Sequence, residues 1–268
     1  MLIGTAASGA LLAAIVLLLI LSLRNDGKEY ATFKLLTDTA ERQRLFRYWT
    51  IKSFLLFSGA ALLALLLLGG LEYLLRMPPE FMPVRRWALE RIASEDGGGG
   101  SGGAFLLLVV GGMLGGAVLG GIASARITKR RGGEIKQVAI GDIEPLFPRN
   151  PAERRWTALL GANAGPGEEL MFRLVLPLII AQLTGNPFLA FGIAAAMFGA
   201  AHFYQGWTGI AATTVAGLLF TGVYIASGSI WLAVFLHMLM NLNSLWLRPL
   251  LQQRFQRALD ASHSSIVQ

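Results

Sequence analysis

The chain has 268 residues, of which 54% are hydrophobic and 15% charged, and it contains no cysteine. Because soluble domains carry about 25% charged residues, this composition predicts a membrane protein and excludes a disordered chain, a disulfide scaffold and a cysteine-ligated metal site. The formal net charge of +7 comes mainly from loops, so we interpret it as a topology signal and expect no nucleic-acid partner.

Apolar stretches that approach the roughly 20 helical residues needed to cross a bilayer follow one another along the chain. They predict an all-α, polytopic transmembrane helical bundle with seven spans, at 2–23, 53–71, 104–125, 169–184, 187–207, 208–227 and 230–247. Residues 83–94 predict a short amphipathic helix on the membrane surface. In the third span, Gly112, Gly116 and Gly120 recur every four residues, which favours close helix packing.

The fourth span is the least regular of the seven. The triplet Gly165-Pro166-Gly167 just before it favours a break in the helix. Residues 156–167 could then form the first part of one broken helix, an interfacial helix or a separate crossing, and a separate crossing would raise the number of spans to eight.

Basic residues in the loops predict the orientation, because cytoplasmic loops hold the excess of Lys and Arg. The loop 24–52 carries seven, 72–96 carries four and 126–155 carries eight. This alternation predicts a multi-pass protein of the cell membrane with its N-terminus outside and its C-terminus in the cytoplasm. The first 23 residues lack the positive start of a signal peptide and are expected to stay as an anchor.

The charge distribution also divides the chain into three regions. Residues 1–155 form an N-terminal three-span region with basic loops, 156–247 form a core with very few charges, and 248–268 form a polar tail.

The only formal charges in the core are those of Glu168, Glu169 and Arg173. Ionisable side chains are costly inside a bilayer and usually have a functional role there. Glu169 and Arg173 stand four residues apart with the acid first, which predicts a helical ion pair. Glu168 points about 100° away around the helix. It is therefore a candidate general base or acid, and the alternative of a carboxyl group hydrogen-bonded to backbone has equal weight.

Two histidines lie in the same core. His202 follows Phe198 by one helical turn, and His237 precedes Asn241 by one turn. A single membrane histidine is more often packed than catalytic, but two histidines, an amide and a spare carboxylate in one block favour a functional site. The third histidine, His263, lies in the polar tail and is not expected to take part.

In order and spacing these residues resemble the CPBP family of intramembrane proteases, which groups type II CAAX prenyl endopeptidases with bacteriocin-processing and immunity (Abi) proteins. The family is marked by Glu-Glu-x-x-x-Arg, then Phe-x-x-x-His, then His-x-x-x-Asn or Asp. The chain has all three complete, at 168–173, 198–202 and 237–241. The resemblance covers about a third of the chain, roughly 156–247.

The resemblance implies an integral-membrane endopeptidase that hydrolyses a peptide bond at or near the membrane. Its partners would be an unidentified protein or peptide substrate and membrane lipid. The residues that it assigns are the water-activating pair Glu168 and His202, the oxyanion-stabilising pair His237 and Asn241, and the structural pair Glu169 and Arg173.

Several alternatives stay open at this point. Relatives are often called metalloproteases, and Glu168, His202 and His237 could together ligate zinc, although the His-Glu-x-x-His signature is missing. The chain could instead be a non-catalytic membrane scaffold or immunity protein of the same fold. A transporter or channel is disfavoured, because the sequence has neither a second cluster of ionisable residues nor an inverted repeat.

Overall fold

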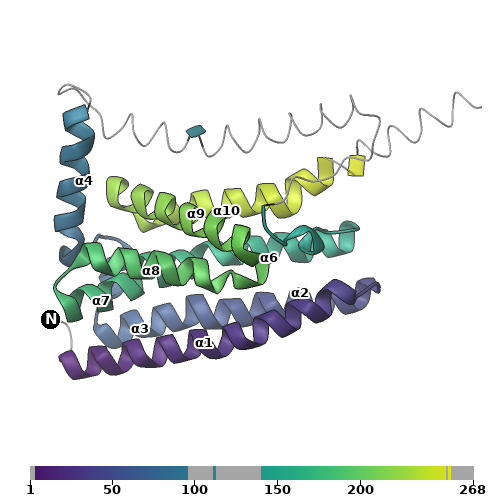
Figure 1. Ribbon diagram of the computed structural model, residues 1–268, viewed down its shortest axis with the longest axis horizontal. Helices are drawn as coiled ribbons and strands as arrows, with labels where there is room; N and C mark the ends of the chain where they lie inside the picture. Colours follow the sequence, from purple (N-terminus) through teal and green to yellow (C-terminus); the bar gives the residue numbers. More distant parts are fainter. Residues whose placement is uncertain (1–3, 96–110, 113–139, 252, 255–268) are drawn as a thin grey trace, which may run out of the picture.

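The computed structural model describes residues 4–95, 111–112, 140–251 and 253–254, and every regular element in these ranges is helical (Figure 1). This confirms the all-α membrane bundle. The helical segments long and apolar enough to cross a membrane are Thr5–Leu35, Thr39–Leu68, Phe203–Ser227 and Ile230–Leu251, and Pro187–Ala201 is a shorter apolar helix. The predicted third span lies almost wholly outside the described residues, so the total of seven stays a prediction.

The first two spans extend well beyond their apolar stretches. Helix α1 (Thr5–Leu35) continues into charged residues, and the second segment begins with the charged helix α2 (Thr39–Ser53) before the π-helical turn η1 (Phe54–Gly59) and α3 (Ala60–Leu68). Asp38 caps α2 by accepting hydrogen bonds from the first free backbone N–H groups. The charged ends of α1 and α2 therefore lie together at one end of the bundle (Figure 1).

Helix α4 (Met82–Glu95) follows two short 3-10 turns, η2 (Leu71–Leu74) and η3 (Pro79–Phe81). The helix expected at 83–94 is therefore present. It runs across the direction of α1 and α3, at the end of the bundle where α1 begins (Figure 1). This orientation is the one expected of a helix that lies on the membrane surface. The surface location of α4 stays a prediction.

The expected break at Gly165-Pro166-Gly167 is wrong. Helix α6 (Pro151–Glu169) passes through Pro166 and continues into the π-helical η5 (Leu170–Val175) and α7 (Leu176–Thr184). The irregularity thus lies after the triplet, and 156–184 belongs to one helical segment rather than two elements. Gly165 and Gly167 are buried in helix contacts, which explains why they do not act as breakers here.

Small residues on α6 let helix α10 (Ile230–Leu242) approach closely. A Cβ atom added to Gly165 would lie 2.4 Å from Met238 Cγ and 3.2 Å from Val234 O, and one added to Gly161 would lie 3.2 Å from Asn241 Cβ. This is the small-residue spacing of four that membrane helices use for close packing. It brings α10 beside the end of α6, where the core's carboxylates are.

Replacing Gly165 by alanine is expected to lower the free energy of unfolding by about 1–3 kcal/mol, because the added methyl group overpacks a contact with backbone atoms of α10. Thermal unfolding of the purified protein in detergent measures this. Gly222→Ala is the matched control, since a Cβ there meets nothing within 4 Å. Equal melting temperatures for the two variants would contradict the close approach.

The rest of the core is completed by α8 (Pro187–Ala201), η6 (Phe203–Gln205), α9 (Gly206–Ser227), α10 and η7 (Asn243–Leu247). Gly185 and Gly228 end α7 and α9 with φ of 68° and 74°, a conformation that glycine adopts without steric cost. These tight turns make α7 and α8, and then α9 and α10, sequential neighbours that pack together.

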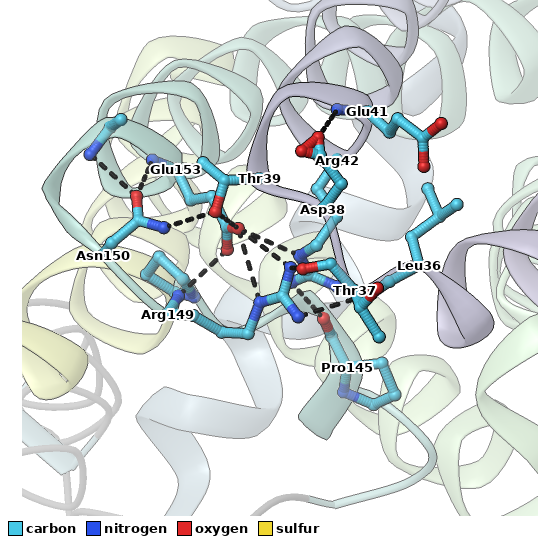
Figure 2. A network of polar contacts seen from close by, with 12 residues as sticks. Leu36, Thr37, Asp38, Thr39, Glu41, Arg42, Pro145, Arg149, Asn150 and Glu153 are labelled. Carbon is cyan, nitrogen blue, oxygen red and sulfur yellow. Dashed lines mark hydrogen bonds and ion pairs between the residues drawn. The ribbon is translucent and has the colours of Figure 1, made fainter.

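A polar network fastens the turn between α1 and α2 to the start of α6 (Figure 2). The carboxylate of Glu153 lies 3.2 Å from Arg42 Nε, and both side chains are almost fully buried. Arg149 also binds Glu153 and donates to the backbone oxygens of Leu36 and Thr37. The start of α2 is therefore joined to the start of α6 by a buried ion pair as well as by apolar packing.

Candidate active site

Three helices bring the polar residues of the core together. Glu168 lies in the last turn of α6, His202 directly follows α8, and His237 is in the middle of α10. The Oε2 atom of Glu168 is 3.8 Å from His202 Nε2 and 3.8 Å from His237 Nε2. The Glu168 carboxylate thus faces both histidines, which reach it from other helices.

The orientation of His202 follows from its own helix. Its Nδ1 atom is 2.8 Å from the backbone oxygen of Phe198, one turn earlier. Because a carbonyl oxygen only accepts hydrogen bonds, Nδ1 carries the proton. In the neutral ring, Nε2 therefore presents its lone pair toward Glu168.

His237 is held by a contact that the sequence did not reveal. Its Nδ1 atom is 2.7 Å from Glu169 Oε1, and its ring stacks on Phe220 with centroids 4.8 Å apart and planes inclined by 16°. A carboxylate accepts from Nδ1–H and so fixes the ring's tautomer and direction. Glu169 therefore positions His237 in addition to its place beside Arg173.

Glu169 and Arg173 lie at the spacing expected for a helical pair, with 3.0 Å between Oε1 and Nη1, and both side chains are buried. The guanidinium also lies over the ring of Phe198, 4.0 Å from its centroid. A Cβ atom at Gly217 would come within 3.2 Å of Arg173 Nη2. The guanidinium of Arg173 is thus surrounded by the carboxylate of Glu169, the ring of Phe198 and Gly217, which has no side chain to occupy this space.

Asn241 lies one turn beyond His237 on the partly buried face of α10. Its Nδ2 atom donates to the backbone oxygen of Gly161, at 3.2 Å. The amide nitrogen of Asn241 carries two protons. This hydrogen bond uses one of the two N–H groups and joins Asn241 to α6.

The three candidate zinc ligands have suitable chemistry, and the Glu168 oxygen lies somewhat farther from each histidine nitrogen than in a closed tetrahedral zinc site. Ligands at about 2.0–2.1 Å in a tetrahedral site are roughly 3.3 Å apart, whereas Glu168 Oε2 is 3.8 Å from each histidine nitrogen. Over the described residues, no group of three or more His, Cys, Asp or Glu side chains is arranged to hold a metal. We therefore derive no chemical step through a metal.

The loop after His202 is supported by the N-terminal region. Tyr204 packs against His202, with ring centroids 6.0 Å apart, and meets Tyr30 of α1 edge to face at 5.1 Å. The hydroxyl of Tyr30 donates to the backbone oxygen of Asp142, whose own N–H donates to Gln205 O at 2.8 Å. Residues that no sequence motif includes thus form one side of the site.

Comparison with known proteins identifies one family over this part of the chain. The family described as type II CAAX prenyl endopeptidase Rce1-like matches residues 152–243. This segment contains α6 to α10 and all three motifs, while α1 to α4 lie outside it. No curated protein and no solved structure matches the chain.

Proposed function

We propose that this multi-pass membrane protein hydrolyses a peptide bond with a glutamate-dependent site, because residues 152–243 match the family described as type II CAAX prenyl endopeptidase Rce1-like. The observation that carries the proposal is the equal distance of 3.8 Å from Glu168 Oε2 to Nε2 of His202 and of His237. These three groups meet where α6, α8 and α10 converge.

The first step is activation of water. A separation of 3.8 Å is too long for a direct hydrogen bond, so Glu168 Oε2, which has no hydrogen-bond partner among the described residues, is available to accept from a water. Glu168 takes a proton from the water while the lone pair of His202 Nε2 orients it. The water oxygen then bonds to the carbonyl carbon of the substrate, and the carbonyl oxygen becomes an oxyanion.

The second step is stabilisation of the oxyanion and release of the product. His237 enters the cycle with a proton on each ring nitrogen and keeps both to its end: Nδ1–H donates to Glu169 Oε1 at 2.7 Å, and Nε2–H donates to the oxyanion. The second N–H of Asn241 is the other donor. When the C–N bond breaks, Glu168 returns its proton to the leaving amine, which balances the reaction.

A peptidase assay on the full chain in proteoliposomes tests the proposal. The substrates are quenched fluorescent peptides ending in a CAAX sequence, with and without a prenyl group. We expect cleavage that is unchanged by thorough chelation, together with less than one equivalent of bound zinc by elemental analysis. Activity that disappears on demetallation and returns with zinc would contradict the metal-free mechanism. Failure to cleave any peptide would favour a non-catalytic scaffold or immunity protein.

A further inference from the structure

An open groove lies where α1 passes the loop after His202. It has a volume of about 490 Å³ and is lined by Leu23, Arg24, Gly27, Lys28 and Phe203. Helix and loop meet closely here, since a Cβ atom at Gly27 would lie 2.8 Å from the ring of Phe203. The groove is therefore formed by the N-terminal region and the core together, next to the candidate site.

The groove carries two positive charges. Arg24 and Lys28 are one helical turn apart and exposed, and their side chains make no hydrogen bond or ion pair with any residue that the structure describes. The acids of the same helix turn, Asp26 and Glu29, lie on another face and bind Lys52 at 2.8 and 2.9 Å. The two cations thus favour an anionic ligand.

Helix length places the cations at the membrane boundary. The helix is uncharged from its start at Thr5 to Leu23, which at 1.5 Å per residue is roughly 28 Å and matches a hydrocarbon core of about 30 Å. Arg24 is the first charge after it, at the depth of the lipid headgroups. The loop-charge pattern predicts that this boundary faces the cytoplasm.

Below the cations, the same face of α1 is apolar and open to lipid. Leu17 and Ile20 precede Arg24 by seven and four residues, so they lie on its side of the helix. They are 57% and 47% exposed. A ligand with both an anionic head and a hydrocarbon chain fits this face, whereas a free phosphate or a peptide carboxylate would use only the cations.

We propose that this groove binds an anionic phospholipid. The phosphate lies between Arg24 and Lys28, and an acyl chain follows Leu17 and Ile20 toward the centre of the bilayer. The bound headgroup rests against Phe203, the neighbour of His202. The proposal requires a membrane protein with this fold and does not depend on the proposed peptidase activity.

Native mass spectrometry of the full chain, titrated in detergent with phosphatidylglycerol or phosphatidylcholine, tests the site. We expect preferential binding of phosphatidylglycerol, and an affinity about 30-fold weaker in the double variant Arg24→Gln/Lys28→Gln, from two cation contacts of ordinary strength. The control Arg44→Gln/Arg47→Gln removes the same charge from exposed positions of α2 and should bind as the wild type does. Each single substitution, Arg24→Gln or Lys28→Gln, should weaken binding about fivefold, which keeps the test available if the double variant fails to insert.

Three results would overturn the proposal. One is an equal loss in the test and control double variants, which would indicate general attraction to positive charge. Another is inorganic phosphate competing as strongly as the lipid does, which would indicate a free-anion site. The third is unchanged lipid binding in Arg24→Gln/Lys28→Gln with a raised KM only for peptides that have a free C-terminal carboxylate, which would assign the groove to substrate.

Discussion

Replacing Glu168 by glutamine is expected to lower the rate of peptide cleavage by about 10²–10⁴-fold, the usual contribution of a general acid–base group. The amide keeps the size of the carboxyl group but cannot take the proton from water. Cleavage of a validated peptide by purified protein in proteoliposomes, compared at equal amounts of inserted protein, measures the effect. The side chain of Glu168 is 13% exposed, and the Oε2 atom that faces the two histidines is itself buried and has no hydrogen-bond partner among the described residues.

The choice of Glu168 over its neighbour keeps this experiment specific. Glu169 contacts both Arg173 and His237, so its replacement would alter packing and chemistry together. Glu41→Gln is the matched control, because Glu41 is an exposed side chain on α2. A Glu168→Gln protein that unfolds at the wild-type temperature and cleaves at the wild-type rate would remove Glu168 from the mechanism.

Much of the fold was predictable because the bilayer imposes length and composition on each span. The apolar stretches 2–23, 208–227 and 230–247 correspond to helices that the structure contains. The charged continuations of α1 and α2 were not predicted, since hydropathy marks only the part of a helix that lies in lipid. The break expected at Gly165-Pro166-Gly167 was wrong because local propensity yields to packing on both sides of α6.

The candidate site was predictable to the extent that its contacts are local. Spacings of four residues on one helix anticipated that Glu169 lies beside Arg173 and that His202 lies one turn from Phe198. Contacts between helices carry no such signal, so the bond from His237 to Glu169 could not be read from the sequence. The Gly-x-x-x-Gly spacing at 161–165 favours the close approach of α6 and α10, but Gly165 also belongs to the triplet Gly165-Pro166-Gly167, which by itself favours a break.

The second large effect is expected at the buried ion pair that joins α2 to the start of α6. Glu153→Gln should lower the free energy of unfolding by about 3–5 kcal/mol, because Arg42, only 3% exposed, would keep its charge without a compensating carboxylate. Thermal and denaturant unfolding in detergent measure the loss. Glu72→Gln is the control, since the pair Glu72–Arg76 is exposed and such pairs contribute about 1 kcal/mol or less.

A double variant separates lost charge pairing from lost packing. Arg42→Met/Glu153→Leu replaces both ions by apolar groups of similar size and should recover most of the stability that Glu153→Gln loses, since buried pairs are often replaceable in this way. If the double variant is as unstable as Glu153→Gln, the contribution of Glu153 comes instead from its hydrogen bonds to Arg149 and Thr39.

The same pair predicts a dependence on pH. Burial alone would raise the pKa of Glu153, but hydrogen bonds from Arg149 and the charge of Arg42 hold that pKa below its usual value. A carboxyl group with a lowered folded-state pKa stabilises the fold fully above the unfolded-state pKa of about 4.3 and loses this effect as the pH falls through the folded-state value. The difference in stability between wild type and Glu153→Gln should therefore be constant from pH 6 to 8 and shrink below about pH 4. A difference that stays the same at low pH would mean that ionisation of Glu153 does not stabilise the junction between α2 and α6.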